Sequence, residues 1–269
     1  MLFCDLDLSK RLERAEGYGC MQWADARRRV FPDSGSEWIE HAGAFVVFDG
    51  VDSPVTQTFG LGLFEPLSAE VLESIEQFFR SRGAPVQHEI SPFVGVPALE
   101  LLCARGYKPM EVSSVMVQPV DYAIGASPSP TRVRVIDAGE SAIWADVSAR
   151  GWSHEHPELL EFLQNLGKVA VARAEGISFL AEIDGTPGAA GSLCLHEGVA
   201  LFGGSATVPE LRRRGLQAAL LRERMRYAHD SGCDLAMIVA EPGSNSQRNA
   251  ERAGFRIAYT RTKWRLPAS

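Results

Sequence analysis

The apolar positions in the second half of the chain follow helical and strand periods in turn. Residues 212–230 (RRRGLQAALLRERMRYAHD) place most of their apolar side chains on one helical face, namely Leu216, Ala219, Leu220, Met225 and Ala228. The flanking stretches 198–208 (GVALFGGSATV) and 234–241 (DLAMIVAE) are rich in residues that favour strands. A further helix is predicted to end at Gly254, and a last strand to begin at Phe255.

The first half of the chain shows the same order of segments at one constant offset. Gly106 and Tyr107 correspond to Gly254 and Phe255, and the helical run 64–82 corresponds to 212–230. The two copies share little identity, so the repeat rests on order and spacing. Between them, residues 121–131 have the Pro, Ser and Gly content of a linker. We therefore expect two copies of one α/β unit, at 1–120 and 132–269.

Composition and charge indicate which partners and which cell compartment to expect for this protein. The chain is 45% hydrophobic and 23% charged, as in ordinary folded proteins, and its net charge of −7 argues against nucleic acid. No apolar run approaches the roughly 20 residues of a membrane span, and the N-terminus lacks the pattern of a secretory signal. Five scattered cysteines without a CxxC pair indicate reduced thiols. We expect a cytoplasmic protein without a membrane or nucleic-acid partner.

Positive charge gathers where the helix in 212–230 begins, although the whole chain is acidic. Three arginines, Arg212, Arg213 and Arg214, precede Gly215. The first N–H groups of a helix have no intrahelical acceptor, so a glycine turn there suits a phosphate or pyrophosphate. The alternative is a solvated basic turn paired with Glu210 and Glu223. Cations at this end oppose the helix dipole at roughly 0.3–1 kcal/mol each, which favours the anion site.

The first copy lacks these features. Its corresponding residues are Phe64, Glu65, Pro66 and Leu67, and a second acid, Glu70, follows. Negative charge at a helix start favours the dipole but repels an anionic ligand. The first copy is therefore not expected to hold a phosphate.

The arginine turn resembles the acetyl-CoA-binding turn of the GNAT N-acetyltransferase superfamily, R/Q-x-x-G-x-G/A. Arg212 and Gly215 match the first two positions, whereas Gln217 stands at the third. A second family signature is similar to 242–255 (PGSNSQRNAERAGF), and 133–150 is similar to the opening strand and helix of that fold. The resemblance implies an α/β fold (α+β mixed sheet) of two tandem GNAT-like domains, each a central mostly antiparallel sheet flanked by helices. The first would be a degenerate copy.

The resemblance also implies acetyl-CoA as the co-substrate. The pantetheine arm would pair with the backbone around Ala206, Thr207 and Val208, and the N–H groups from Arg213 to Ala218 would hold the pyrophosphate. Asn245 and Asn249 would lie near the cofactor from the other side. The cofactor-binding set is thus Ala206, Thr207, Val208, Arg212, Arg213, Arg214, Gly215, Leu216, Gln217, Ala218, Asn245 and Asn249.

The proton donor and the base are less clearly marked. In the family a tyrosine often precedes the closing Gly-Phe by four residues, but this chain has Ala250 there. Tyr259, a serine (Ser244 or Ser246) or solvent would have to protonate the leaving thiolate. Two glutamates are candidate bases that would act through water. Glu241 lies at the end of a predicted strand, and Glu197 lies in a turn just before another.

Residues 151–163 (GWSHEHPELLEFL) are the candidate acceptor wall. Trp152 with His154 and His156 could bind a cationic or aromatic amine. Alternatively, Trp152 packs in the core and the histidines cap the next helix. His-x-His without a third ligand does not indicate a metal, and none is expected.

The expected function is an N-acetyltransferase that moves an acetyl group from acetyl-CoA to a primary amine of a small molecule or protein. The alternative is a non-catalytic acyl-CoA-binding sensor, which Ala250 favours. Another acyl donor, such as succinyl- or propionyl-CoA, would bind at the same turn. An internal tandem can replace a dimer, so we expect a monomer or a homodimer.

Overall fold

The structure, a computed structural model, describes residues 3–120, 131–154 and 157–267. Most of the linker expected at 121–131 therefore lies outside the described residues. The chain divides into two compact units. The first comprises Met1–Val117, Val239–Glu251 and Phe255–Ser269, and the second comprises Gln118–Ile238 and Arg252–Gly254.

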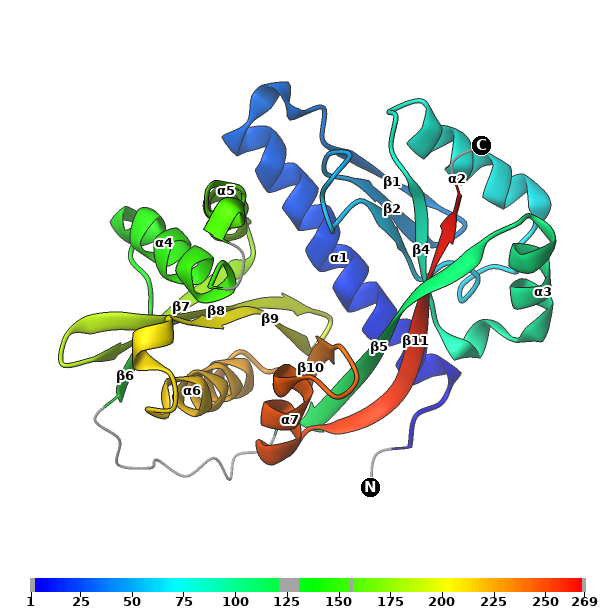
Figure 1. The fold of residues 1–269 in the computed structure, drawn as a ribbon. Coiled ribbons are helices and arrows are strands. Elements are labelled where there is room, and N and C mark those ends of the chain that lie inside the picture. Colours follow the sequence, from blue (N-terminus) through cyan, green and yellow to red (C-terminus); the bar gives the residue numbers. More distant parts are fainter. Residues whose placement is uncertain (1–2, 121–130, 155–156, 268–269) are drawn as a thin grey trace. The chain divides into compact units, whose positions relative to one another are not determined.

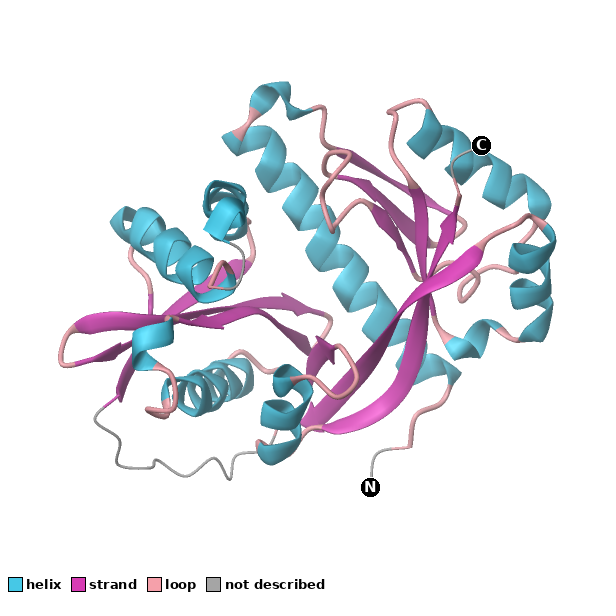
Figure 2. Cartoon of the chain, in the orientation of Figure 1, coloured by secondary structure: helices cyan, strands magenta, loops and turns pink. Residues whose placement is uncertain are grey.

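The first unit is a sheet with helices on both faces (Figures 1 and 2). Its elements are α1 (Leu6–Val30), β1 (Glu37–His41), β2 (Ala44–Phe48), β3 (Gln57–Phe59), α2 (Ala69–Arg80), β4 (Val86–Ile90), α3 (Val96–Ala104), β5 (Lys108–Pro119), α7 (Asn245–Arg252) and β11 (Arg256–Leu266). The strand order is β1-β2-β3-β4-β11-β5, and β3 and β4 form its parallel pair. The other neighbouring strands are antiparallel.

Strand β2 shows how the sequence builds this core. Every one of its five residues is buried, because alternate side chains point to opposite faces of the sheet. Val46 packs with α2 and α3 residues such as Leu72 and Leu102, whereas Phe45 packs with Met21 of α1. The unbroken apolar run of β2 is thus explained by helices on both faces.

The second unit repeats this plan. Its elements are β6 (Thr131–Val135), α4 (Ser141–Trp152), α5 (Leu160–Val171), β7 (Gly176–Ile183), β8 (Thr186–His196), β9 (Val199–Thr207), α6 (Leu216–Asp230) and β10 (Leu235–Ala240). The strand order is β10-β9-β8-β7-β6, antiparallel except for β9 and β10. Helices α4 and α5 cover one face and α6 the other (Figure 1). The expectation of mixed, mostly antiparallel sheets flanked by helices is confirmed.

The repeated order of elements is plain in both halves of the chain. Three strands, a helix, a strand, a helix and a strand follow one another from β1 to β5 and again from β7 to β11. Helices α2 and α6 lie within 64–82 and 212–230, as the sequence predicted. The halves differ before this repeat: the single helix α1 stands where the second half has β6, α4 and α5.

The last strand of the chain lies in the sheet of the first unit. In Figure 1, β11 (red) runs between β4 and β5, and it pairs with both in antiparallel register. The compact units therefore differ from the ranges 1–120 and 132–269. No local pattern could have shown this, because β11 finds its neighbours in segments far away in the sequence.

Candidate functional site

Strands β9 and β10 separate along their length. They pair in parallel only from Val199 with Leu235 to Leu201 with Met237. β9 continues to Thr207, and within the described residues no pairing with β10 is recorded past Leu201. An unpaired strand edge presents N–H and C=O groups that can bond an extended ligand. The predicted cofactor residues Ala206 and Thr207 lie on this stretch.

A tight contact fixes the end of β9 against helix α4. A Cβ atom at Gly151 would lie 2.6 Å from the Cβ of Ala206 and 3.0 Å from the backbone nitrogen of Thr207. On the β8 side, the Val208 N–H donates to the Gly188 carbonyl at 2.9 Å. Sequence reasoning missed Gly151 and Gly188; a glycine inside the helical run of α4 was the available signal.

The turn before α6 has an unusual backbone. Arg213 and Gly215 adopt left-handed conformations, with φ of 62° and 85°, and Arg214 between them does not. Such alternation directs successive N–H groups to one side and forms an anion-binding concavity. The Ala219 N–H donates to the Gly215 carbonyl at 3.0 Å, which leaves the N–H groups of residues 216–218 without an acceptor inside the helix.

The side chains around this turn leave the concavity accessible. Apart from the neighbours of Gly215 in the chain, no atom of the described residues lies within 4 Å of the position that a Cβ would occupy at Gly215. Leu216 is 1% exposed and anchors the helix start in the core, whereas Ala218 is exposed. Gln217, at the third family position, is half-buried, and its Oε1 has no hydrogen-bond partner among the described residues.

The three arginines have different roles. Arg212 donates to the backbone carbonyls of Thr207 at 3.2 Å and Gly151 at 3.1 Å, so its guanidinium ties the turn to β9 and α4. Arg213 and Arg214 are exposed, and no partner is recorded for their side chains within the described ranges. The free positive charge of the turn therefore comes from these two residues.

The expected ion-pair partners of the turn are engaged elsewhere. Glu210 lies 3.5 Å from Arg150, and Glu223 pairs with Arg226 within α6. The interpretation of the arginine turn as a self-neutralised surface is therefore not supported. Two exposed cations at the positive end of a helix dipole favour an anionic ligand.

The equivalent helix start in the first half is closed. Ser68 caps α2 by accepting the Val71 N–H at 3.3 Å, whereas α6 has Gly215 at this position, with no side-chain cap. Phe64 lies against Gly43 and Gly60, where a Cβ atom would approach within 3 Å of its side chain. At this helix start an N–H group is thus used internally, and residues 64–67 contain no arginine.

Helix α7 carries the second family signature. Asn245 and Asn249 are exposed and, four residues apart, lie on one face of the helix. Ala250, at the position of the family tyrosine, is only 1% exposed and packs inward. By the division into units, Asn245 and Asn249 belong to the first unit, whereas the arginine turn belongs to the second.

Tyr259 does not have the properties expected of a proton donor to the leaving group. Its hydroxyl donates to Glu13 Oε1 at 2.8 Å inside the first unit. Burial, followed by the charge of Glu13, raises the pKa of Tyr259 well above its usual range. A tyrosine that is buried, bonded to a carboxylate and less acidic than usual is a poor acid catalyst, so the expectation for Tyr259 is corrected.

Glu197 also lies apart from the turn. It occupies the β8–β9 hairpin with a φ of 45°, and its side chain is 70% exposed, with Oε2 4.0 Å from Nε2 of His196. Glu197 precedes the first residue of β9, and the eight steps from Val199 to Thr207 span about 26 Å at about 3.3 Å per residue. The structure does not bring it together with the predicted cofactor residues.

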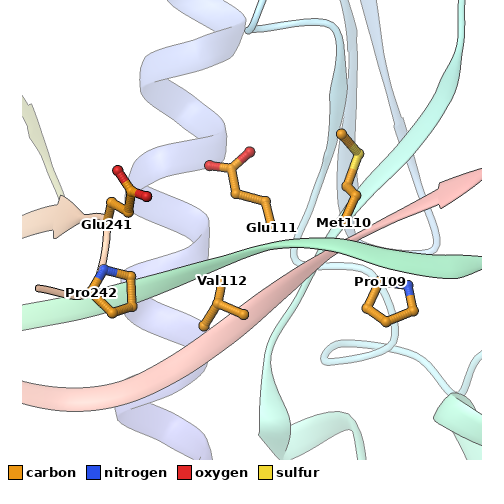
Figure 3. A pocket seen from close by; sticks show the side chains of 6 residues that line it. All are labelled: Pro109, Met110, Glu111, Val112, Glu241 and Pro242. Carbon is orange, nitrogen blue, oxygen red and sulfur yellow. The ribbon is translucent and has the colours of Figure 1, made fainter.

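Glu241 lines a hollow of about 520 Å³ within the first unit (Figure 3). The other lining residues are Pro109, Met110, Glu111, Val112 and Pro242. Figure 3 shows the carboxyl groups of Glu111 and Glu241 on the same side of β5. Lys263 Nζ holds Glu111 Oε2 at 2.8 Å. Met110 and Val112 are 50% and 46% exposed, so acidic and apolar groups share this surface.

The expected acceptor wall is only partly described. Trp152 ends α4 and is 57% exposed, so it is not the core residue of this helix. That residue is Trp144, 1% exposed, whose Nε1 donates to the Phe179 carbonyl at 3.0 Å. His154 is exposed, and His156 lies outside the described residues.

The described ranges meet neither the requirements of a metal site nor those of a membrane-spanning helix. No group of three His, Cys, Asp or Glu side chains there is arranged to hold a metal ion. No helix there has both the length and the apolar character that crossing a membrane requires.

An opened pair of parallel strands, a left-handed glycine turn and an uncapped helix lie together in an α/β domain, and comparison with known proteins identifies its family. Residues 140–255 match the model of the acetyltransferase (GNAT) family. The chain therefore contains a GNAT-family acetyltransferase domain, as its sequence motifs indicated. No curated protein matches the chain.

Solved structures extend the similarity of fold beyond this domain. A GCN5-related N-acetyltransferase from Kribbella flavida has a TM-score of 0.71 at 15% identity, covering 97% of this chain and 96% of that one. A second, from Sphaerobacter thermophilus, has a TM-score of 0.58 at 17% identity, covering 94% and 91%. A tandem GNAT protein from the clavulanic acid biosynthesis pathway has a TM-score of 0.56 at 13% identity, covering 84% and 79%.

Proposed function

We propose that this protein transfers an acetyl group from acetyl-CoA to a primary amine of a small molecule or protein. The turn before α6 carries the proposal, because it combines left-handed Arg213 and Gly215, uncapped N–H groups and two exposed arginines. A pyrophosphate supplies the charge and the acceptor oxygens that such a turn lacks. The GNAT-family domain over residues 140–255 supports acetyl transfer as the reaction.

In this proposal the cofactor binds largely through backbone groups. N–H groups from Arg213 to Ala218 hold the pyrophosphate, and the unpaired edge of β9 at Ala206–Val208 bonds the pantetheine arm. Arg212 contributes indirectly, because it holds the Thr207 carbonyl and thereby the end of the strand. Asn245 and Asn249 are assigned to the cofactor by the family signature.

The chemistry requires a neutral amine and a stabilised carbonyl. The amine nitrogen attacks the thioester carbon, the C–N bond forms, and the C–S bond breaks with release of the CoA thiolate. We assign Glu241 as the base that takes the amine proton through water. With Ala250 buried and Tyr259 bonded to Glu13, solvent is assigned to protonate the thiolate.

A cationic acceptor suits the described side chains best. The hollow at Glu241 also presents Glu111, together with exposed Met110 and Val112. Carboxylates with neighbouring apolar groups match an alkylammonium ion, which is charged at one end and apolar along its stem. Exposed Trp152 and His154, with His156, remain the proposed contacts for an aromatic or cationic acceptor.

Replacing Gly215 tests the cofactor site directly. Gly215→Trp places a large side chain over the uncapped N–H groups, so acetyl-CoA binding measured by calorimetry should be lost. Gly232→Trp is a matched control, because Gly232 follows the other end of α6 and has a φ of 78°. Its Cβ position also has no atom of the described residues within 4 Å, apart from its neighbours in the chain. It should bind acetyl-CoA as the wild type does. Equal binding by both variants would place the cofactor elsewhere, and a folded wild type without binding would remove the proposed function.

A non-catalytic acyl-CoA sensor is the second candidate, favoured by the absence of a free tyrosine at the expected position. The two functions differ in turnover. CoA release from acetyl-CoA with a panel of alkyl diamines and lysine peptides should depend on the amine and should fall strongly in Glu241→Gln, with acetyl-CoA affinity unchanged. Tight binding without CoA release for any amine would favour the sensor. Undiminished turnover in Glu241→Gln would remove Glu241 as the base.

A further inference from the structure

Helix α6 buries an arginine beneath the sheet of the second unit. Arg224 is 1% exposed, and within the described residues no carboxylate lies within ion-pair distance. Its guanidinium donates instead to the backbone carbonyls of Ser192 at 3.2 Å and Gly203 at 3.4 Å, and its Cζ lies 4.9 Å from the centre of the Phe202 ring. Burial lowers the pKa of Arg224 to about 9.

The two carbonyls that Arg224 binds stand next to a bulge in the β8–β9 pair. Ser192 pairs with Gly203 and Ala190 with Ala206, so one residue of β8 faces two of β9. Gly204, with a φ of 59°, has the left-handed conformation of the first residue in a G1-type bulge. A bulge bends its strand and increases the local twist. The direction of β9 from Ser205 to Thr207 therefore depends on this bulge.

The sequence makes room for the guanidinium at this point. A Cβ atom at Gly191 would lie 3.2 Å from Cζ and Nη1 of Arg224, so a side chain there would displace the arginine. The opposite face of the bulge is filled by Trp144, whose ring would lie 3.7 Å from a Cβ at Gly204. Arg224 and Trp144 thus hold the bulge from its two faces.

An arginine is a costly way to fill this space. A buried charge without a counter-ion loses its hydration, and its bonds to carbonyls return only part of that free energy. An apolar side chain of similar length, such as methionine, would fill the space without this cost. What methionine cannot do is donate to the Ser192 and Gly203 carbonyls and hold them together.

We propose that Arg224 is a positioning residue for acyl-CoA binding: by bonding the Ser192 and Gly203 carbonyls it fixes the β9 bulge, and thereby the unpaired edge at Ala206–Thr207. This inference rests on the proposed function, in which that edge bonds the pantetheine arm. Arg224 touches neither the cofactor nor the acceptor in this arrangement. Its effect on binding comes from the direction that it imposes on β9.

The test compares Arg224→Met and Arg224→Lys with the control Arg226→Met, on an exposed face of the same helix. Arg224→Met should raise the Kd for acetyl-CoA at least about tenfold while the melting temperature without ligand stays close to that of the wild type or rises. Arg224→Lys, which keeps one donor group, should lie between. Arg226→Met should bind as the wild type does.

Amide hydrogen exchange of the ligand-free protein supplies a second readout. Residues 204–208 should exchange faster in Arg224→Met while β7 and α6 are unchanged. An unchanged Kd with unchanged exchange in a folded Arg224→Met protein would overturn the inference, as would a fall in melting temperature with faster exchange throughout the unit. If the wild type itself does not bind acetyl-CoA, the proposed function fails, and exchange alone then decides whether Arg224 holds the bulge.

Discussion

At the scale of single residues, His88 is the clearest pH-sensitive group of the first unit. The ring is fully buried in β4, and its Nε2 lies 3.0 Å from the Tyr107 hydroxyl. That hydroxyl donates to Glu76 Oε1 at 3.1 Å, so the neutral ring donates to the tyrosine oxygen. Burial lowers the pKa of His88 from 6.5 to about 3, although the charge of Glu76 acts in the opposite direction.

Stability should therefore fall as the solution is acidified. Below pH 6.5, His88 of the unfolded chain binds a proton that His88 of the folded chain does not. The free energy of unfolding therefore decreases as the pH falls from 6.5 towards about 3. Between about pH 6.5 and pH 5 the loss from this group is about 2 kcal/mol. Urea unfolding across this range should show a smaller pH dependence in His88→Gln. Equal slopes in the two proteins would mean that His88 is protonated in the folded state.

The arginine turn shows which residue-scale features a sequence reveals. Three consecutive arginines before Gly215 predicted an anion site, and this stays a prediction. The sequence could not show that Arg212 bonds the Thr207 and Gly151 carbonyls, because Gly151 is brought to the turn only by the packing of α4. Similarly, the sequence could not show that the Tyr259 hydroxyl donates to Glu13 of the first helix, because the two residues are far apart along the chain.

At the scale of elements, the contrast between α2 and α6 explains why one helix start is a candidate site. Both helices follow the third strand of the repeat and occupy the positions that their apolar periods predicted. Ser68 satisfies an N–H group of α2 locally, as capping residues generally do. Gly215 offers α6 no such cap, so an external acceptor has access to its N–H groups.

The sequence predicted strand β9 but not the details of its pairing. Its small and β-branched residues predicted a strand, and the structure has one from Val199 to Thr207. The same residues, including Gly203 and Gly204, gave no indication of where pairing with β10 ends or where the bulge lies. Both are decided by the pairing of β9 with β8 and by buried side chains from α4 and α6, which are contacts between separate segments.

At the scale of the whole chain, the last strand joins a sheet whose other strands come from the first 119 residues. Buried charges help to hold it there. Arg261 of β11 is 1% exposed and contacts three carboxylates, with 2.9 Å to Glu13, 2.6 Å to Glu16 and 3.1 Å to Glu89. Glu13 and Glu16 lie on α1, so the first helix and the last strand meet through one guanidinium.

Removing that guanidinium should destabilise the protein far more than removing an exposed charge from the same strand. Arg261→Met leaves buried Glu13 and Glu89 without their main counter-ion, at a cost of about 3–5 kcal/mol in the free energy of unfolding. Arg265→Met, at an exposed position of β11, should change it by no more than about 0.5 kcal/mol. Urea denaturation of both variants measures the difference.

A second substitution separates lost attraction from uncompensated charge. Burial raises the pKa of Glu13 even with Arg261 beside it, so Glu13 depends strongly on that counter-ion. If uncompensated charge is the main penalty, Glu13→Gln should lower the stability of the wild type but recover part of the loss in the Arg261→Met background. Purely additive losses in the double variant would mean that packing, and not charge, holds β11 against α1. In that case the ion cluster would follow from the pairing of β11 with β4 and β5 and would not direct it.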